Sequence, residues 1–302
     1  DLPVLIEGET GVGKELFARA IRSTSPAAGG AFVPLNCGGM PRDLIASELF
    51  GYARGAFTGA HEAGRAGKIE QADGGVLCLD EIGEMPFDLQ SYLLRVLEDG
   101  IVYRIGDHVG RRVDIRILSM TNRHMAAEVE AGRFRRDLYH RIAAVRIRIP
   151  PLRERGEDII TLARRFAETA ATRHGRRGLM FAPDVLDQFR RYSWPGNVRE
   201  LRNVVDAAVA LTDSDMVSLD DLPPELSGTI STTYDEPRVS PTSSPEDATD
   251  TSSNLKETER AAILAQVEAC GGNLTKAAQR LGIARSTLYL RLKAYGGRRP
   301  LR

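Results

Sequence analysis

The chain has 302 residues, 42% of them hydrophobic and 27% charged, and a formal net charge of zero. This composition is ordinary for a soluble protein and allows about two domains with a substantial core. No stretch approaches the roughly 18 consecutive apolar residues of a membrane span, and no charged-then-apolar leader opens the chain. We therefore expect a cytoplasmic protein without membrane contacts.

The first motif is a phosphate-binding loop that lies between a strand pattern and a helix pattern. The residues from Gly8 to Lys14 read G-x-x-x-x-G-K and follow the apolar run Val4-Leu5-Ile6. Glycines let the backbone curl until its N–H groups face an anion, and Lys14 can reach the terminal phosphates. The motif predicts nucleoside triphosphate binding, and a plain glycine turn is the alternative. The predicted ATP-binding residues are Gly8, Glu9, Thr10, Gly11, Val12, Gly13, Lys14 and Glu15.

Glu15 departs from the usual motif, because a Ser or Thr hydroxyl normally follows the lysine and helps to hold magnesium. Metal binding must then depend on a second site. We also expect an N-terminally truncated fragment, since the chain begins at the strand that feeds the phosphate loop.

Cysteines and charges limit the other chemistry of the chain. Cys37, Cys78 and Cys270 are odd in number and widely separated, which argues against a disulfide framework or a structural zinc site. We expect reduced thiols in or near the core. From Leu255 to Arg302 there are ten Lys/Arg against three Asp/Glu, a surplus of seven. This basic module suggests a polyanionic partner.

Apolar runs alternate with helical spacing over the first half of the chain, which predicts an α/β domain with about five parallel strands. From Asp158 to Leu211 the strand signals vanish and helical patterns indicate an attached subdomain. Thirteen of the 28 residues between Ser227 and Asn254 are Ser or Thr, which predicts a flexible linker. The expected strands are 4–6, 32–35, 76–79, 115–120 and 145–149, and the expected domains are 1–155, 156–226, the linker 227–254, and 255–302.

A second motif completes the predicted ATPase site. The apolar strand from Gly75 ends in Asp80-Glu81, which places two carboxylates at the carboxyl edge of the sheet near the phosphate loop. In a triphosphatase such an Asp holds Mg²⁺ directly or through water, while the adjacent Glu orients and deprotonates the attacking water. Asn122 follows another strand, where it is either a sensor of the terminal phosphate or an ordinary turn residue.

The segments 48–60 and 67–75 closely resemble the AAA+ domain of bacterial sigma-54-dependent transcriptional activators, the enhancer-binding proteins. The Gly-Lys-Glu form of the phosphate loop matches the same family. The resemblance implies an α/β P-loop NTPase fold with a parallel sheet and a helical lid, followed by a separate all-α domain. It covers nearly the whole chain except the linker.

The hexapeptide Gly55, Ala56, Phe57, Thr58, Gly59 and Ala60 is the signature of that family. A short glycine-bracketed loop suits a mobile tip, and an exposed Phe57 is unexplained unless a partner covers it. The resemblance implies that this loop grips the sigma factor, with Phe57 and Thr58 as contacts.

The resemblance also implies roles for four further residues. Asn36 would hold the catalytic Glu81 in an inactive rotamer, although from the sequence without the resemblance a strand-end cap is the preferred interpretation. Arg135 and Arg141 would be arginine fingers that reach a neighbour's nucleotide, whereas an Arg-rich helix is often only a solvated face. Arg199, in the octapeptide from Trp194 to Leu201, would touch the phosphates as a second sensor. Fingers acting in trans require a ring, which the family forms as hexamers.

The basic module reads as two helices joined by a turn at Gly282, a helix-turn-helix pattern. Ala277 and Ala278 allow close helix contact, and Leu281, Ile283, Leu288 and Leu292 would share a core. A helical packing module that is merely basic is the alternative. The module resembles the Fis-type domain, which acts as a dimer on double-stranded DNA. The predicted DNA-binding residues are Arg285, Ser286, Thr287, Tyr289, Arg291 and Lys293.

We therefore predict an activator that binds an upstream activating sequence, forms a ring and uses ATP with Mg²⁺ to remodel sigma-54 RNA polymerase holoenzyme into an open promoter complex. It would belong to a two-component or ligand-responsive system whose regulatory domain lies upstream. One rival is another AAA+ machine, such as a helicase loader or unfoldase, which should lack the hexapeptide. A second rival is a DNA-binding repressor that binds nucleotide without hydrolysis.

Overall fold

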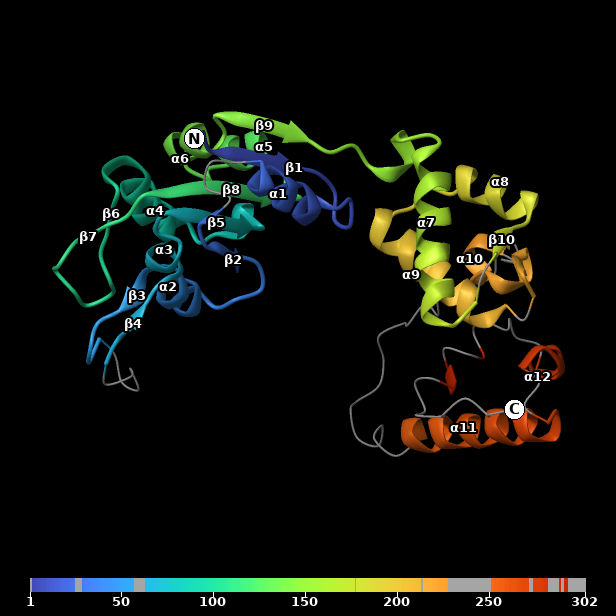
Figure 1. Ribbon diagram of the computed structural model, residues 1–302. Coiled ribbons are helices and arrows are strands. Elements are labelled where there is room, and N and C mark those ends of the chain that lie inside the picture. Colours follow the sequence, from blue (N-terminus) through green and yellow to red (C-terminus); the bar gives the residue numbers. More distant parts are fainter. Residues whose placement is uncertain are drawn as a thin grey trace. The chain divides into compact units, whose positions relative to one another are not determined.

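The computed structural model describes two compact units, which Figure 1 draws as ribbons. The first unit holds residues 1–154 and 196–199, and the second holds residues 155–195 and 200–302. The described residues are 2–24, 29–56, 63–176, 178–212, 214–227, 251–271, 274–281, 288 and 291–292.

A five-stranded parallel sheet forms the centre of the first unit (Figure 1), with the strand order β2-β5-β8-β1-β9. The central strands are apolar on both faces because helices cover both, as is usual for parallel sheets. The strands are β1 (Val4–Glu7), β2 (Phe32–Asn36), β5 (Gly75–Asp80), β8 (Ile115–Thr121) and β9 (Val145–Arg148). The predicted α/β class is confirmed, and each predicted strand agrees to within one residue at either end.

Helices pack on the two faces of the sheet through separate hydrophobic clusters. Leu5 belongs to one cluster while its neighbours Val4 and Ile6 belong to the other, because successive strand side chains point to opposite faces. The Leu5 cluster takes side chains from α2, α4 and α6, and the other takes Ala18 from α1. The helices are α1 (Lys14–Ser23), α2 (Arg42–Phe50), α3 (Lys68–Gln71), α4 (Phe87–Asp99), α5 (Met125–Glu130) and α6 (Arg136–Ile142), with the short 3-10 helices η2 (Ile82–Glu84) and η3 (Leu152–Glu154).

The carboxyl ends of the strands set the position of the site. β1 lies between β8 and β9, and the register places Glu7 beside Thr121. At the same carboxyl edge, in the neighbouring pair β2 and β5, Asn36 lies beside Asp80. In open α/β sheets, ligands bind outside these carboxyl ends where the strand order reverses. The phosphate loop after β1 and the acids after β5 therefore leave the same edge of the sheet.

Two short antiparallel hairpins leave this unit and were not predicted from the sequence. They pair β3 (Gly51–Tyr52) with β4 (Arg65–Ala66), and β6 (Ile101–Val102) with β7 (Arg111–Arg112). Strands of two residues are too short to carry a period-two pattern, so the apolar spacing gave no signal for them.

The second unit is mainly helical, as predicted, around a cluster of aromatic rings. Phe189 packs edge-on against Phe181 and Trp194 with ring centroids 5.4 Å apart in both pairs. The expectation that strands are absent here was wrong, because β10 (Met180–Phe181) pairs with β11 (Met216–Val217). The helices are α7 (Asp158–Arg173), α8 (Pro183–Arg191), α9 (Asn197–Leu211) and α10 (Pro224–Ser227), with η4 (Leu219–Asp221); the first three residues of α9 group with the first unit.

The C-terminal helices are α11 (Thr251–Ala269) and α12 (Leu274–Leu281). Of the predicted core, Leu288 is buried and Leu281 and Leu292 pack against the buried cluster, while Ile283 lies outside the described residues. Ala277 and Ala278, which were expected to allow close helix contact, are buried in the same cluster. Because α11 begins at Thr251, it takes four residues of the expected linker, and Ser227 ends α10. Ser, Thr and Asn are favoured both in linkers and at helix starts, so composition does not locate this boundary. Residues 228–250 lie outside the described part.

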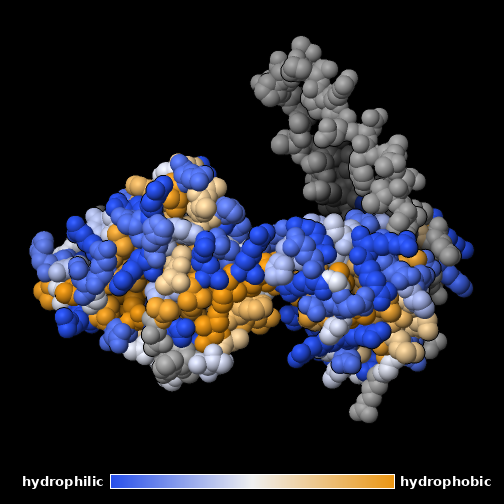
Figure 2. All heavy atoms as spheres, turned by 90° about the horizontal axis from the view of Figure 1, so that it is seen from above, coloured by the Kyte–Doolittle hydropathy of each residue, from blue (hydrophilic) through white to orange (hydrophobic). Residues whose placement is uncertain are grey.

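In Figure 2, the visible face of the first unit carries a broad band of hydrophobic residues among hydrophilic ones, whereas that of the second unit is mostly hydrophilic. In the parts of the chain that the structure describes, no helix combines the length and the apolar character needed to cross a membrane.

Two adjacent glycines give a test of the packing at the edge of the sheet. A Cβ at Gly30 would lie 2.3 Å from the Gly74 carbonyl oxygen, whereas a Cβ at Gly29 would meet nothing within 4 Å. Backbone atoms cannot move aside cheaply, so Gly30→Ala should lower the free energy of unfolding by about 3 kcal/mol. Gly29→Ala should change it by no more than about 0.5 kcal/mol. Urea unfolding measures both, and equal effects would contradict this packing.

Candidate active site

The phosphate loop leaves β1 at Gly8 and enters α1 at Lys14. Gly11 and Gly13 have φ values of 82° and 101°, in the left-handed region that favours glycine. The Gly8 N–H donates to the Thr121 carbonyl oxygen at 3.2 Å, which ties the start of the loop to β8. The backbone is thus curled and anchored, as an anion cradle requires.

The side chain of Lys14 folds back over this loop. Its Nζ donates to the carbonyl oxygens of Gly8 at 2.8 Å and Glu9 at 3.1 Å. Burial lowers the pKa of Lys14, and the positive charge of Arg199 lowers it further, whereas the charges of Asp80 and Glu81 oppose that shift. The phosphate lysine, both predicted acids and the predicted second sensor therefore lie within electrostatic reach of one another.

The two acids follow β5 directly. Glu81 has a φ of 51°, which is unusual for a residue with a side chain, and its N–H donates to Asp80 Oδ1 at 3.0 Å. A Cβ placed on Gly38 would lie 1.8 Å from Glu81 Oε2. The Glu81 carboxylate therefore lies directly against the backbone of Gly38, in space that only a glycine leaves open.

Asn36 reaches Glu81 only indirectly. Its Oδ1 accepts the Gly38 N–H at 2.7 Å, which fixes the turn against which the Glu81 carboxylate lies. Among the described residues no hydrogen bond joins the side chains of Asn36 and Glu81. The contact itself matches the strand-end cap that the sequence left open, and it also shapes the place that Glu81 occupies.

The two predicted sensors both contact the phosphate loop. Asn122 Nδ2 donates to Thr10 Oγ1 at 3.2 Å, and the Arg199 N–H donates to the Gly11 carbonyl oxygen at 3.2 Å. Arg199 belongs to the same compact unit as the loop.

Sequence reasoning missed two residues that contact this loop. Arg153 forms a two-pronged ion pair with Glu9, and the buried side chain of Asn197 also donates to Glu9. Asn197 lies in the octapeptide that was noted for Arg199, so its position gave a signal. Arg153 gave none, because it lies 144 residues from Glu9 in the sequence.

Three predicted site residues have other partners in this chain. Glu15 Oε1 accepts hydrogen bonds from Arg19 at 2.7 and 3.1 Å on the exposed side of α1. Arg135 pairs with Asp137, and Arg141 Nη2 donates to the Leu97 carbonyl oxygen at 2.6 Å. Within the described residues, neither arginine makes a hydrogen bond or ion pair with the phosphate loop.

Two of the three cysteines are buried beside the site. Burial, with the nearby charges of Asp80 and Glu81, raises the pKa of the Cys37 thiol to about 12. Burial likewise raises the pKa of Cys78 to about 12. Cys270 is partly exposed, and all three thiols are free. Such high pKa values keep the two buried thiols neutral, so neither is suited to act as a nucleophile.

The hexapeptide continues from the β3–β4 hairpin. Gly55 and Ala56 are described, whereas Phe57, Thr58, Gly59 and Ala60 lie outside the described residues. The stem of this hairpin is hydrogen-bonded to the β6–β7 segment, since the Ala53 N–H donates to the Ile105 carbonyl oxygen at 2.9 Å. Next to that contact, Arg104 makes two hydrogen bonds of 2.7 Å to the Glu70 carboxylate.

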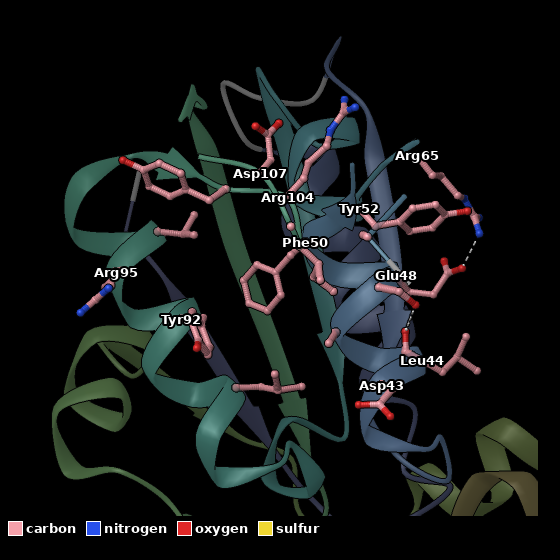
Figure 3. Close-up of a pocket in the computed structure, with 18 of the residues that line it drawn as sticks. Asp43, Leu44, Glu48, Phe50, Tyr52, Arg65, Tyr92, Arg95, Arg104 and Asp107 are labelled. Carbon is pink, nitrogen blue, oxygen red and sulfur yellow. Dashed lines mark hydrogen bonds and ion pairs between the residues drawn. The ribbon is translucent and has the colours of Figure 1, made fainter. Parts of the chain in front are cut away.

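A cavity of about 1320 Å³ opens beside this stem, between α2 and α4. Figure 3 shows the ring of Phe50 from α2 and that of Tyr92 from α4 side by side in its lining, where they pack edge to face with centroids 6.0 Å apart. An ion pair between Arg65 and Glu48 at 2.8 Å links β4 to α2 at its edge (Figure 3). The cavity therefore lies where the hairpin stem meets the helices.

The predicted DNA-binding residues are described only in part. Arg291 is exposed, and Arg285, Ser286, Thr287, Tyr289 and Lys293 lie outside the described residues.

The contact of Glu81 with Gly38 leads to a prediction for nucleoside triphosphate hydrolysis. Gly38→Ala would force the flexible Glu81 carboxylate to move, so the melting temperature should change little. If the turn at Asn36 and Gly38 is the resting place of Glu81, losing about 1 kcal/mol there should raise the basal rate of phosphate release about fivefold. A phosphate-release assay measures this, and a rate equal to that of the wild type would contradict it.

Three protein families match successive parts of the chain. Residues 1–148 match the Sigma-54 interaction domain, and residues 153–238 match the AAA+ ATPase lid domain. Residues 254–295 match the Fis family of bacterial regulatory proteins.

Known proteins match the chain over most of its length. It is 44% identical to transcriptional regulatory protein ZraR of Klebsiella oxytoca, over 97% of this chain and 63% of that protein. It is 48% identical to the DNA-binding transcriptional regulator NtrC of Salmonella typhimurium, over 74% of this chain and 48% of that protein. A Geobacillus stearothermophilus protein named limonene hydroxylase is 44% identical, over 98% of this chain and 52% of that protein. The chain thus spans about half to two thirds of the length of these relatives.

A solved structure matches as well: NtrX of Brucella abortus in complex with ADP has a TM-score of 0.69 and 33% identity, over 98% of this chain and 65% of that one. With the phosphate loop, the paired acids and the stem of the hexapeptide loop in place, the chain belongs to the family of sigma-54-dependent transcriptional activators, which are AAA+ ATPases with a Fis-type helix-turn-helix domain.

Proposed function

We propose that this chain binds upstream DNA, assembles into a ring and uses ATP hydrolysis to remodel sigma-54 RNA polymerase holoenzyme into an open promoter complex. One observation carries the proposal: Lys14 of the phosphate loop lies within electrostatic reach of Asp80 and Glu81 at the carboxyl edge of one parallel sheet. The three matched families extend over residues 1–148, 153–238 and 254–295, and none of them is a hydroxylase.

ATP would bind along the phosphate loop, from Gly8 to Glu15. The curled backbone turns N–H groups toward the phosphates, and Lys14 would exchange its carbonyl partners for phosphate oxygens. Glu81 would take a proton from the attacking water, and Asn122, already bonded to Thr10, would contact the terminal phosphate or that water. NtrX, the similar protein solved in complex with ADP, supports nucleotide binding by this chain.

Magnesium fits this site with few protein ligands. Mg²⁺ usually keeps several waters and binds through one or two carboxylates together with substrate phosphates. Asp80 would hold it directly or through water, because Glu15 supplies no hydroxyl and pairs with Arg19. Bound there, the ion would neutralise charge on the phosphate oxygens.

A ring would complete the site with arginines from a neighbouring subunit. Planar guanidinium groups suit the charge that develops on a transferred phosphoryl group, and Arg135 and Arg141 match the family's finger positions. Arg135 is now paired with the exposed Asp137, and Arg141 donates to the Leu97 carbonyl oxygen. A neighbour's phosphate oxygens can replace both acceptors. We infer a hexamer from the family resemblance.

Sigma-54 would be gripped by the hexapeptide from Gly55 to Ala60, with Phe57 and Thr58 as contacts. The stem of that loop is braced by backbone hydrogen bonds to the segment around Ile105. Such bracing suits a loop that transmits force to a partner.

DNA binding would be the task of residues 255–302, acting as a dimer on paired half-sites. Arg291 is exposed, and with Arg285 and Lys293 it would add affinity that falls as salt rises. Ser286, Thr287 and Tyr289 would complete the contacts to DNA. Since promoter DNA and RNA polymerase are its partners, the protein would act in the cytoplasm, under a two-component or ligand-responsive signal.

Hydrolysis can be tested with three variants of the full chain. Lys14→Ala should abolish ATP binding, because it removes the cation at the phosphates. Glu81→Gln should bind ATP but release phosphate at least about 100-fold more slowly, since it removes the general base. Glu98→Gln changes an exposed carboxylate on α4 and should match the wild type. Equal, background release by all proteins would support the repressor alternative instead.

Sigma-54 contact can be tested on native gels with ADP and aluminium fluoride as a transition-state analogue. The wild type and Thr172→Ala, which changes an exposed hydroxyl on α7, should shift sigma-54 into a slower band. Thr58→Ala should lose that band because it removes the proposed contact hydroxyl. The absence of any shifted band, or a band that persists with Thr58→Ala, would count against sigma-54 remodelling.

A further inference from the structure

We propose that Glu9 is a positioning residue: its carboxylate, held by Arg153 and Asn197, couples nucleotide binding in the phosphate loop to the position of the sensor segment around Arg199. The inference rests on the proposed ATP binding at the same loop. We call Glu9, Arg153 and Asn197 the clasp.

An acid in a phosphate loop needs an explanation, because its negative charge opposes the binding of a polyanion. Glu9 follows Gly8 directly, and within the loop its backbone carbonyl oxygen, not its carboxylate, accepts the hydrogen bonds from the Val12 N–H and from Lys14. Its carboxylate accepts two parallel hydrogen bonds from Arg153, at 2.6 and 2.9 Å. Such a bidentate pair neutralises the acid and fixes its direction. The charge of Glu9 therefore binds Arg153, and it does so at the edge of the nucleotide site.

Asn197 ties the clasp to both the phosphate loop and the segment that carries Arg153. Its side chain is fully buried, and its Nδ2 donates to Glu9 Oε2 and to the Thr10 carbonyl oxygen, both at 3.1 Å. Its Oδ1 accepts the Leu152 N–H at 2.8 Å. The residue has a φ of 53°, a conformation that Asn tolerates better than most residues. One buried amide thus joins the phosphate loop to the chain next to Arg153.

The sensor segment is held to the loop at successive residues. Asn197 contacts Glu9 and Thr10, and two residues later the Arg199 N–H donates to the Gly11 carbonyl oxygen. The approach is close, since a Cβ on Gly11 would lie 2.3 Å from the Gly196 carbonyl oxygen. A change in the loop's backbone on nucleotide binding must therefore be felt by residues 196–199.

Arg199 lies close enough to Lys14 for its charge to act on that lysine. Its charge contributes to the lowered pKa of Lys14, so a displacement of Arg199 changes the field at the phosphate lysine. On its other side the same loop is held by Asn122, through Thr10. The clasp thus connects Glu9 to the two groups that would face the phosphates, Lys14 and Arg199.

A change of pH near neutrality does not protonate Glu9 and so does not open the clasp. The hydrogen bonds from Arg153, and then that from Asn197, lower the pKa of Glu9 from 4.5 to about 2. A lowered carboxyl pKa stabilises the folded state above pH 4.5, and this contribution is lost as the pH falls from there toward 2. The pair is fully charged at neutral pH, so substitution is the appropriate test.

The chain contains one tryptophan, which reports on the sensor segment. Trp194 is buried and lies three residues before Asn197 in the sequence. In the wild type, ADP binding should change the Trp194 emission, while calorimetry measures the bound fraction independently. Glu9→Gln keeps the size of the side chain and removes its charge. The loss of a negative charge beside the phosphates favours ADP, whereas the loss of the contact that orders the loop disfavours it, so the response is compared per bound nucleotide. Glu9→Gln should at least halve the Trp194 response per bound nucleotide.

Further variants separate coupling from a merely structural tie. Glu98→Gln changes an exposed carboxylate on α4, which belongs neither to the phosphate loop nor to the clasp, and should respond like the wild type. Arg153→Lys keeps the charge but loses the two-pronged geometry, so it should show the same reduced response, and it also serves if Glu9→Gln does not fold. The double variant Glu9→Gln/Arg153→Lys should be no worse than the worse single variant.

The outcomes are distinguishable. Wild-type protein that binds no ADP contradicts the proposed ATP-binding function itself. Wild-type protein that binds ADP without any Trp194 response, or variants with a full response per bound nucleotide and only a lower melting temperature, overturns the clasp and leaves ATP binding intact.

Discussion

The left-handed backbone at Gly11 is the constraint on which the rest of the site depends. Its φ of 82° lets the loop curl, and the missing side chain lets the Gly196 carbonyl oxygen approach to where a Cβ would clash at 2.3 Å. One glycine therefore serves two purposes that are usually separate, a tight turn and a close contact between chain segments. Any side chain here would strain the cradle and also push the sensor segment away from it.

A second feature of the loop is that its own backbone holds the side chain of Lys14. The carbonyl oxygens of Gly8 and Glu9 accept hydrogen bonds from Lys14 Nζ, so the loop itself positions the lysine side chain. Phosphate oxygens carry charge and are stronger acceptors than carbonyls. The exchange of partners is then favourable, and the lysine does not have to be recruited from solvent.

The parallel sheet was predictable because its strands are buried on both faces and read as continuous apolar runs. The phosphate loop and Asp80-Glu81 were predictable because each lies within a few consecutive residues. Pairs such as Arg153 with Glu9, or Arg104 with Glu70, were not, since nothing local in the sequence says which distant charge meets which. The place of Glu81 against Gly38 was also hidden, because a glycine's role there depends on a side chain that the fold brings to it.

A further set of contacts that were not predictable joins the proposed finger helix to the proposed sigma-54 loop. Arg141 of α6 holds the carbonyl oxygen of Leu97 near the end of α4, and the β6–β7 hairpin begins two residues after that helix. From this hairpin, Ile105 is bonded to the stem of the hexapeptide loop. A contiguous set of packed and hydrogen-bonded groups is a physical precondition for coupling, while its strength depends on the energies of the alternative arrangements. If a neighbour's phosphates draw Arg141 away, its hydrogen bond to Leu97 breaks first. The Leu97 carbonyl oxygen, near the end of the helix that leads to the loop stem, is then left without this partner.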